Sequence, residues 1–382
     1  MSSIWTRKAE IGIACAKGLA PYALAEAREA GWRVVAHDSS SVTVHGTLAD
    51  AMRLNLELRT AHRVLFPLLE AEAKNHDHLY RHAASIPWEE YLEPDGYFSV
   101  HGVVRNDTVR DTKMPALKLK DAIADRMRQK TGRRPDSGKE FSGAAVFLIW
   151  RERSLRIFLD TTGDPLSRRG YRLLPGNAPM QEPLAAACVT ATGWDAASPF
   201  ISPMCGSGTP AIEAALIAKR RAPGSFRKFF SFMALRGWKD EAEPLWLEMR
   251  RKSAENELPS AEMPRIVATD ISRDAVRIAR ANARAAGVEQ FISFGVCDFA
   301  ETAVPRPRGA IFMNPEYGER LGEREALVPI YKRIGAWLAD FPSYHAAILT
   351  PSPMLAKATG LKPMELIPFF NGAIDCRLVR FS

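Results

Sequence analysis

The sequence predicts an α/β protein in which a doubly wound, Rossmann-like parallel sheet follows a small α+β region. Short apolar runs alternate with helical patterns over residues 183–382, which is typical of parallel strands joined by crossover helices. A glycine-rich corner, Cys205-Gly206-Ser207-Gly208-Thr209, lies between the first such strand and its helix. Residues 1–70 instead have the order β-α-β-β-α-β, which predicts a ferredoxin-like unit.

The composition is that of a globular protein with two or three domains. The chain has 382 residues, of which 46% are hydrophobic, and its five cysteines lie far apart without a CxxC pair. This pattern argues against a zinc ribbon and against a disulfide framework. The N-terminus has no long apolar stretch, and no apolar run approaches the ~18 residues that a membrane span requires. We therefore expect a cytoplasmic protein with no membrane partner.

Positive charge is concentrated in one segment of the chain. The net charge is +8, and residues 219–252 hold ten Lys or Arg against four Asp or Glu. Such a concentrated excess favours a polyanionic partner such as RNA. The alternative is a solvated helical face with no partner.

Residues 71–160 predict a second α/β unit. A helical pattern begins at residue 76, a strand follows in YFSVHGVVR, a helix covers 117–132, and AAVFLIW and LRIFLD form a hairpin. The helix and its exit present either a phosphate-contacting surface or a solvated face. The basic residues concerned are Lys118, Lys120, Arg126, Arg128, Lys130, Arg133 and Arg134.

Histidines gather at the start of this second unit. His78 and His82 are four residues apart and share a helix face, next to His76 and Asp77. No acidic residue stands between them in an HExxH pattern. We therefore favour a polar helix start and predict no metal site.

Residues 161–182 are rich in glycine, proline and turn-forming residues, which predicts a linker or an ordered loop. Its basic and aromatic side chains would either contact RNA or pin the two halves of the chain together. These are Arg168, Arg169, Tyr171 and Arg172.

The glycine-rich corner predicts a ligand-binding turn. Gly206 and Gly208 permit positive φ and close approach by a ligand, and Pro210 suits the first turn of the following helix. That helix start offers unpaired N–H groups above the strand ends. Asp270 follows the glycines at about three times the usual separation of the dinucleotide fingerprint, which counts against a simple NAD domain.

Acidic residues follow the next two strands. Asp270 is placed to accept hydrogen bonds from a ribose diol, and Asp298 from an exocyclic adenine amine. The alternative for each is a helix cap or a turn residue. The strands lead to one edge of the sheet, so we predict a site for an adenosine-bearing cofactor. Its residues are Cys205, Gly206, Ser207, Gly208, Thr209, Asp270, Ile271, Asp298 and Phe299.

The fourth strand ends in Asn314-Pro315-Glu316-Tyr317, which predicts chemistry on a base amine. The lone pair of such an amine is delocalised into the ring, so its hydrogens must be held to aim the lone pair at a methyl group. The Asn314 side-chain oxygen and the Pro315 carbonyl can accept the two hydrogens. Tyr317 can stack on a base that is flipped out or single-stranded. We predict these three residues to be catalytic.

At these residues the chain resembles the bacterial THUMP-domain RNA methyltransferases, a group that includes large-subunit rRNA guanine-N2 methyltransferases and was formerly labelled N6-adenine-specific DNA methylases. The similarity covers nearly the whole chain and is most specific in KLKDAIADRMRQKTGRRP, in LDTTGDPLSRRGYRLLPGNAPMQEPLAAA, in the CGSGT corner and in NGAIDCRL. The resemblance implies S-adenosylmethionine as cofactor, guanine N2 of rRNA or tRNA as target, and a THUMP unit over 71–160 that binds RNA. Residues 183–382 would form the methyltransferase domain.

Two positions depart from the family's pattern. Ser202 stands where the family has Asp before the glycine corner, which removes a carboxylate expected near the methionine amine of the cofactor. Glu316 stands where the family has a second proline, which frees φ and adds a negative charge beside the target base.

Two other functions stay open. A non-catalytic RNA-binding or ribosome-assembly factor would use the same scaffold. A DNA adenine-N6 methyltransferase would share the Asn-Pro-X-Tyr pattern.

Overall fold

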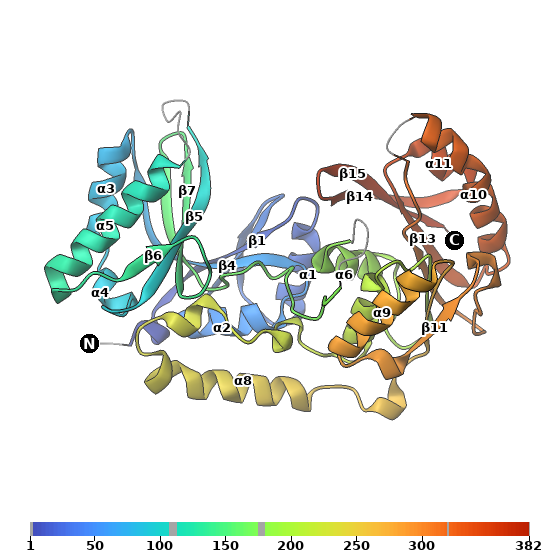
Figure 1. The fold of residues 1–382 in the computed structure, drawn as a ribbon, viewed down its shortest axis with the longest axis horizontal. Coiled ribbons are helices and arrows are strands. Elements are labelled where there is room, and N and C mark those ends of the chain that lie inside the picture. The colour runs from blue at the N-terminus through green and yellow to red at the C-terminus, as the bar shows by residue number, and fades with distance from the viewer. Residues whose placement is uncertain (1–2, 107–112, 175–179, 319–320, 382) are drawn as a thin grey trace. The chain divides into compact units, whose positions relative to one another are not determined.

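A computed structural model describes residues 3–106, 113–174, 180–318 and 321–381. The chain forms two compact units that interleave along the sequence (Figure 1). The first comprises the chain up to Ala16 together with Ala23–Leu166 and Arg227–Lys252, and the second comprises Lys17–Tyr22, Ser167–Phe226 and the chain from Ser253. The inserted segment 227–252 thus belongs with the N-terminal unit, which the sequence patterns did not anticipate.

The first unit is built on one eight-stranded sheet with the order β2-β3-β1-β4-β8-β7-β5-β6. The predicted β-α-β-β-α-β order of its first part is confirmed. Antiparallel pairing of β4 with β8, from Leu65 opposite Asp160 to Glu72 opposite Ser154, joins that part to the second one. The strands are β1 (Lys8–Cys15), β2 (Val34–His37), β3 (Ser41–Thr47), β4 (Ala61–Glu72), β5 (Tyr97–Arg105), β6 (Asp136–Gly138), β7 (Ala144–Arg151) and β8 (Ser154–Asp160).

Capping residues mark the ends of several helices of this unit. Thr47 and Asp50 form a capping box at the start of α2, and Asn75 caps α3 by accepting from the His78 N–H. Gly132, at a φ of 73°, ends α5 in the left-handed region that favours glycine. The helices are α1 (Ala20–Glu29), α2 (Leu48–Glu57), α3 (His76–Ser85), α4 (Trp88–Tyr91) and α5 (Met114–Thr131).

Aromatic side chains of the inserted segment pack against one another. The rings of Phe230 and Phe232 stack with centroids 5.1 Å apart, and Trp246 of α8 (Glu243–Glu255) lies edge-on to both. Arg227, 8% exposed, donates hydrogen bonds to the carbonyl oxygens of Thr162, Asp164 and Pro165. Burial lowers the pKa of Arg227 to about 10. Three carbonyl acceptors compensate for burying its guanidinium group.

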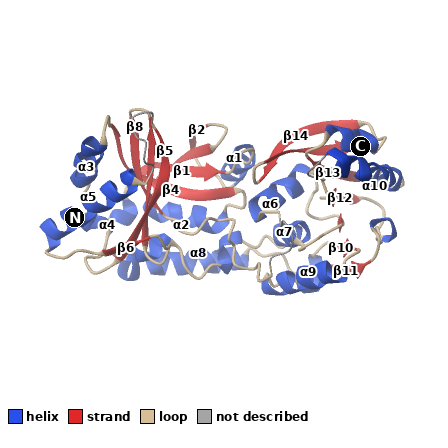
Figure 2. Ribbon diagram, turned by 45° about the horizontal axis from the view of Figure 1, so that its top comes forward, coloured by secondary structure: helices blue, strands red, loops and turns tan. Residues whose placement is uncertain are grey.

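The second unit confirms the predicted doubly wound sheet (Figure 2). Its order is β11-β10-β9-β12-β13-β15-β14, in which the first five are parallel and the last two are antiparallel. The strands are β9 (Phe200–Pro203), β10 (Ile266–Asp270), β11 (Ile292–Val296), β12 (Gly309–Met313), β13 (Tyr344–Thr350), β14 (Pro363–Asn371) and β15 (Ile374–Phe381). Its helices are α6 (Glu182–Ala191), α7 (Thr209–Ala218), α9 (Arg273–Ala285), α10 (Leu321–Ala339) and α11 (Pro353–Ala358).

Helix α10 is longer than its sequence indicates. The helical pattern YKRIGAWLADF predicts a helix over 331–341 only, whereas α10 begins at Leu321 and contains Pro329. Proline removes a helical hydrogen bond, so its presence indicates a break. Tyr331, Ile334 and Trp337 are nevertheless buried in the core of this unit, and that packing offsets the cost of the proline. No helix among the described residues is long and apolar enough to cross a membrane.

Candidate active site

Four adjacent parallel strands bring the predicted site residues to one edge of the second sheet. Strand β9 is flanked by β10 and β12, and β11 lies beyond β10. Parallel strands end at the same edge, so the glycine loop, Asp270, Asp298 and Asn314 all lie there. The order in space places the glycine loop between Asp270 and Asn314.

The two loop glycines have different roles. Both have positive φ, 54° at Gly206 and 83° at Gly208. A Cβ on Gly208 would lie 2.8 Å from the Ala279 Cβ, so this glycine allows the loop to pack on α9. A Cβ on Gly206 would meet nothing within 4 Å. Gly206 therefore leaves the space beside its Cα open to a ligand.

Asp270 is tied to the glycine loop. Its Oδ2 accepts a hydrogen bond from the Gly206 N–H at 2.9 Å, and its Oδ1 accepts from the Ser272 N–H at 2.9 Å. The cap of α9 is Ser272, whose hydroxyl accepts from the Ala275 N–H, so Asp270 is not the helix cap. Ile271 is 75% exposed beside it. An exposed apolar side chain next to a carboxylate suits a ligand with a flat apolar ring and polar edges.

Asp298 and Phe299 are held by the protein itself. The alternative of a cap holds for Asp298, which caps the short 3-10 helix Phe299–Glu301 by accepting from the Ala300 N–H at 3.0 Å, and it also accepts from Arg333 at 2.9 Å. The Ala300 hydrogen bond is the largest of the causes that lower the pKa of Asp298. Phe299 is only 6% exposed and packs edge-on against Trp337. Its side chain is part of the core, so the structure does not present it to a ligand.

The loop after β12 forms a small polar cluster. The Tyr317 hydroxyl donates to the Asn314 Oδ1, and burial raises the pKa of Tyr317. Pro315 is buried and Glu316 is exposed. The buried Tyr331 hydroxyl donates to the Glu316 carbonyl at 3.2 Å and so anchors the main chain of the loop. The Asn314 amide is therefore oriented by a neighbour within the same motif.

Residues 167–174 pack against α7, the helix that follows the glycine loop. Arg169 and Glu213 of α7 form an ion pair at 3.3 Å with 1% and 0% of their side chains exposed, and the Tyr171 hydroxyl donates to Glu213. Burial of Arg169 and Tyr171 assigns these two residues a structural role and not a contact with RNA. Arg172 donates to Thr209 at 3.3 Å and pairs with Glu182 at 3.1 Å.

Asn282 of α9 is a site-supporting residue that the sequence did not single out. Its Oδ1 accepts from the N–H groups of Leu173 and Leu174 at 3.0 and 3.2 Å, and its Nδ2 donates to the Ser207 carbonyl at 3.3 Å. The side chain is 2% exposed. A polar residue one turn after Ala279 on the buried face of an amphipathic helix was the available signal.

Much of the basic segment 219–252 is used internally. Lys219 and Arg221 pair with Glu257 at 3.7 and 2.7 Å, and Arg227 is buried as described. Arg220 and Lys228 are exposed. On α5, Arg126 pairs with Glu89, while Arg128 and Lys130 are exposed, as is Arg134 just after the helix. The candidate phosphate-binding side chains are therefore fewer than the net charge of these segments indicates.

The histidines at the start of α3 contact other residues of the protein. His82 lies 3.1 Å from the Glu72 carbonyl, and the His76 ring packs edge-on against Trp150. Within the described ranges no three His, Cys, Asp or Glu side chains are grouped to hold a metal ion.

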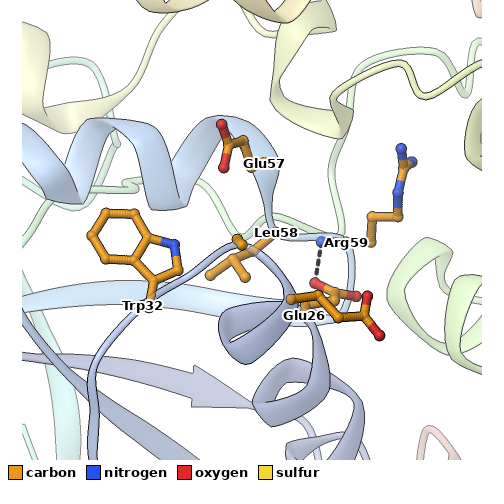
Figure 3. Close-up of a pocket in the computed structure, with 7 residues that line it drawn as sticks. Glu26, Trp32, Glu57, Leu58 and Arg59 are labelled. Carbon is orange, nitrogen blue, oxygen red and sulfur yellow. Dashed lines mark hydrogen bonds between the residues drawn. The ribbon is translucent and has the colours of Figure 1, made fainter. Parts of the chain in front are cut away.

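A cavity of about 200 Å³ lies in the first unit, and none of the predicted cofactor residues lines it (Figure 3). Glu26, Trp32, Glu57, Leu58 and Arg59 line it, and the Glu26 carboxylate accepts from the Arg59 N–H at 2.8 Å. Burial raises the pKa of Glu26. The acidic lining does not suit the anionic backbone of a nucleic acid.

Comparison with known proteins identifies three segments of the chain. Residues 169–380 match a family model described as an RMKL-like methyltransferase domain, residues 10–65 match an RlmL ferredoxin-like domain, and residues 73–138 match a THUMP domain. A ribosomal RNA large subunit methyltransferase K/L from Syntrophotalea carbinolica is 36% identical over 96% of this chain and 52% of its own length. A Synechocystis protein named as an RNA methyltransferase is 32% identical over 96% of this chain and 95% of its own length.

Solved structures show the same fold over nearly the whole chain. The protein SMU.472, described as a methyltransferase and solved in complex with SAH, is 26% identical with a TM-score of 0.88 over 98% of both chains. A Listeria monocytogenes protein described as a predicted N6-adenine-specific DNA methylase is 28% identical with a TM-score of 0.87, over 98% of this chain and 96% of that one. The chain spans about half the length of the K/L methyltransferases that it matches.

Proposed function

The chain belongs to the RMKL-like methyltransferase family, and from that premise we propose that it is an S-adenosylmethionine-dependent RNA methyltransferase that acts on guanine N2 of rRNA. The observation that carries this proposal is the placement of Asn314 next to the glycine loop, on neighbouring parallel strands. That placement supports a site in which Asn314 and Pro315 hold an amine beside a cofactor bound at the glycine loop.

The residues at the sheet edge fit the proposed cofactor. The open space beside the Gly206 Cα, the carboxylates of Asp270 and Asp298 and the exposed Ile271 offer the room, the acceptors and the apolar surface that an adenosine moiety requires. Cys205, Ser207, Gly208 and Thr209 complete the turn. When bound, S-adenosylmethionine supplies an electrophilic methyl group on a sulfonium. The SAH in the SMU.472 structure supports this choice of cofactor.

Ser202 bears on how the cofactor amine is held. Ser202 lies in β9 and is 2% exposed. A buried hydroxyl therefore stands where the family has a carboxylate. We propose that backbone groups of the loop take a larger share of the binding, with a weaker affinity than a carboxylate would give.

The chain's own residues hold the amine. The Asn314 Oδ1 has two lone pairs, of which one accepts from Tyr317 and the other is available to the target amine. The Pro315 carbonyl is the second acceptor. Positioning of this kind can supply a large part of a rate enhancement without a general base. The target base would stack on the Tyr317 ring.

RNA is the proposed partner because a THUMP domain matches residues 73–138 and because exposed basic side chains remain on α5 and at Arg220 and Lys228. Guanine N2 of rRNA is favoured over tRNA by the K/L relatives, whose name gives rRNA as their substrate. We propose that the enzyme works in the cytoplasm, where its five free thiols would stay reduced.

Methyl incorporation tests the proposal. The full chain is incubated with labelled S-adenosylmethionine and either rRNA from a strain that lacks the gene or genomic DNA. We expect label in rRNA, recovered as N2-methylguanosine after nuclease digestion, and none in DNA. Asn314→Ala should lose at least tenfold in turnover with RNA binding retained. Label in DNA as N6-methyladenine would favour a DNA methyltransferase, and RNA binding without label would favour a non-catalytic factor.

A further inference from the structure

We infer that Glu316 is a specificity-determining residue, whose carboxylate accepts a hydrogen bond from N1–H of the target guanine and so selects guanine over adenine. The inference rests on the proposed function, because it concerns the base whose amine Asn314 and Pro315 hold.

The position of Glu316 supports this role. It follows Pro315 directly, so its carboxylate is one side-chain length from the proposed carbonyl acceptor of the amine. The main chain of the loop is fixed, because Pro315 is buried and the Glu316 carbonyl accepts from the fully buried Tyr331 hydroxyl at 3.2 Å. The Glu316 side chain is exposed. An anchored backbone thus presents a side chain that is free to meet the base edge.

The carboxylate of Glu316 is not used elsewhere in the described part of the chain. The ion pairs between described residues include none to Glu316. Asp298, on the same sheet edge, is by contrast held by Arg333 at 2.9 Å. Glu316 therefore keeps its hydrogen-bonding capacity for a ligand.

The chemistry of the two purines decides which base is accepted. Guanine presents N1–H and the N2 amine side by side as donors, so a carboxylate and the Asn314–Pro315 pair can accept from adjacent atoms. Adenine presents a lone pair at N1, which a carboxylate repels. One residue thus attracts the correct base and disfavours the wrong one. A site built to hydrogen-bond a substrate group discriminates strongly against analogues that lack it.

The test compares guanine with 2-aminopurine, which keeps the amine but has no hydrogen at N1. The full chain is incubated with a short synthetic RNA. This RNA carries either base at the position of the guanine that the enzyme methylates in rRNA. We expect wild type to prefer guanine by at least tenfold in kcat/KM. Glu316→Gln should reduce this preference to below about threefold, because its amide N–H can donate to the bare N1 of 2-aminopurine.

Two further variants sharpen the comparison. Glu316→Pro, the family residue, should stay active and methylate 2-aminopurine better than wild type does. Glu301→Gln removes another exposed carboxylate near the same sheet edge and should leave the preference unchanged. Thermal unfolding of each variant, which we expect to match wild type, checks that the fold is intact.

The outcomes separate the two proposals. An unchanged preference in Glu316→Gln, with wild type active on guanine, would overturn the role of Glu316 alone. A wild type that transfers no methyl group to RNA, or that methylates adenine, would overturn the proposed function and this inference with it.

Discussion

The hydroxyl of Tyr317 donates a hydrogen bond to the side-chain oxygen of Asn314. A donor at Oδ1 fixes which end of the amide is oxygen, and therefore which atom faces an incoming amine. The tyrosine of this motif thus orients its neighbour, in addition to its predicted contact with the base. The predicted stacking role uses the ring, whereas this contact uses the hydroxyl.

Tyr317→Phe separates these two roles. The ring is kept, so we expect KM for RNA to change by less than about twofold, whereas kcat should fall by about tenfold because the Asn314 amide loses its orientation. Tyr317→Ala removes both features and should also raise KM. Steady-state methylation of rRNA measures both constants. A phenylalanine variant with wild-type kcat would show that the hydroxyl does not position Asn314.

Asn282→Ala should weaken the glycine loop. The substitution leaves the Leu173 and Leu174 N–H groups and the Ser207 carbonyl without their side-chain partner, at a cost of about 1–3 kcal/mol of unfolding free energy. Calorimetry should show S-adenosylmethionine bound at least fivefold more weakly.

A matched variant distinguishes local support from general stability. Asn55 of the first unit is also buried and donates to Ala51 and Thr161 at 2.8 Å. Asn55→Ala should lower stability similarly with cofactor affinity unchanged. Equal losses of affinity in both variants would contradict a specific role for Asn282.

Arg220→Glu with Lys228→Glu should weaken RNA binding, because these exposed charges of the basic segment remain for phosphate. The slope of log affinity against log salt should become shallower by about one for each phosphate that the variant no longer neutralises. Filter binding at several salt concentrations measures it. Lys357→Glu, exposed on α11, is the control and should leave the slope unchanged. If the double variant has the same slope as wild type, residues 220–228 form a solvated face that does not contact RNA.

The raised pKa of Glu26 predicts a pH dependence of stability. Burial is the largest cause, partly offset by the hydrogen bond from the Arg59 N–H. The folded carboxyl keeps its proton to a higher pH than the unfolded one, whose pKa is about 4.3. Stability therefore falls as pH rises from the unfolded pKa through the folded one, and stays lower above it.

Glu26→Gln should remove this fall, because its side chain is neutral at every pH. Urea unfolding of wild type and variant from pH 4 to pH 8 measures the difference, with exposed Glu29→Gln as control. A difference curve that is flat with pH would contradict the assignment.

Local patterns predicted the strand ends well, because short apolar runs, glycines and acids lie next to one another in the sequence. Asp270, Asp298 and Asn314 reach one edge as expected because parallel strands share a direction. The predicted roles of these residues in binding and catalysis remain predictions.

What the patterns could not predict depends on pairing and packing between residues far apart in the sequence. Pairing of β4 with β8 joins residues about ninety positions apart, and no local signal encodes it. Charge counting could not show that Arg169 and Arg227 are buried. Helix α10 likewise continues past Pro329 because its side chains pack in the core, which the local sequence does not indicate.

The interleaving of the two units has a consequence for how the protein can be divided. The chain passes from one unit to the other after Ala16, Tyr22, Leu166, Phe226 and Lys252. A fragment that starts at residue 183 would carry Phe230, Phe232 and Trp246 without the sheet of the unit to which they belong. Such a fragment would expose aromatic surface and aggregate, so neither unit can be excised as one continuous piece of the chain.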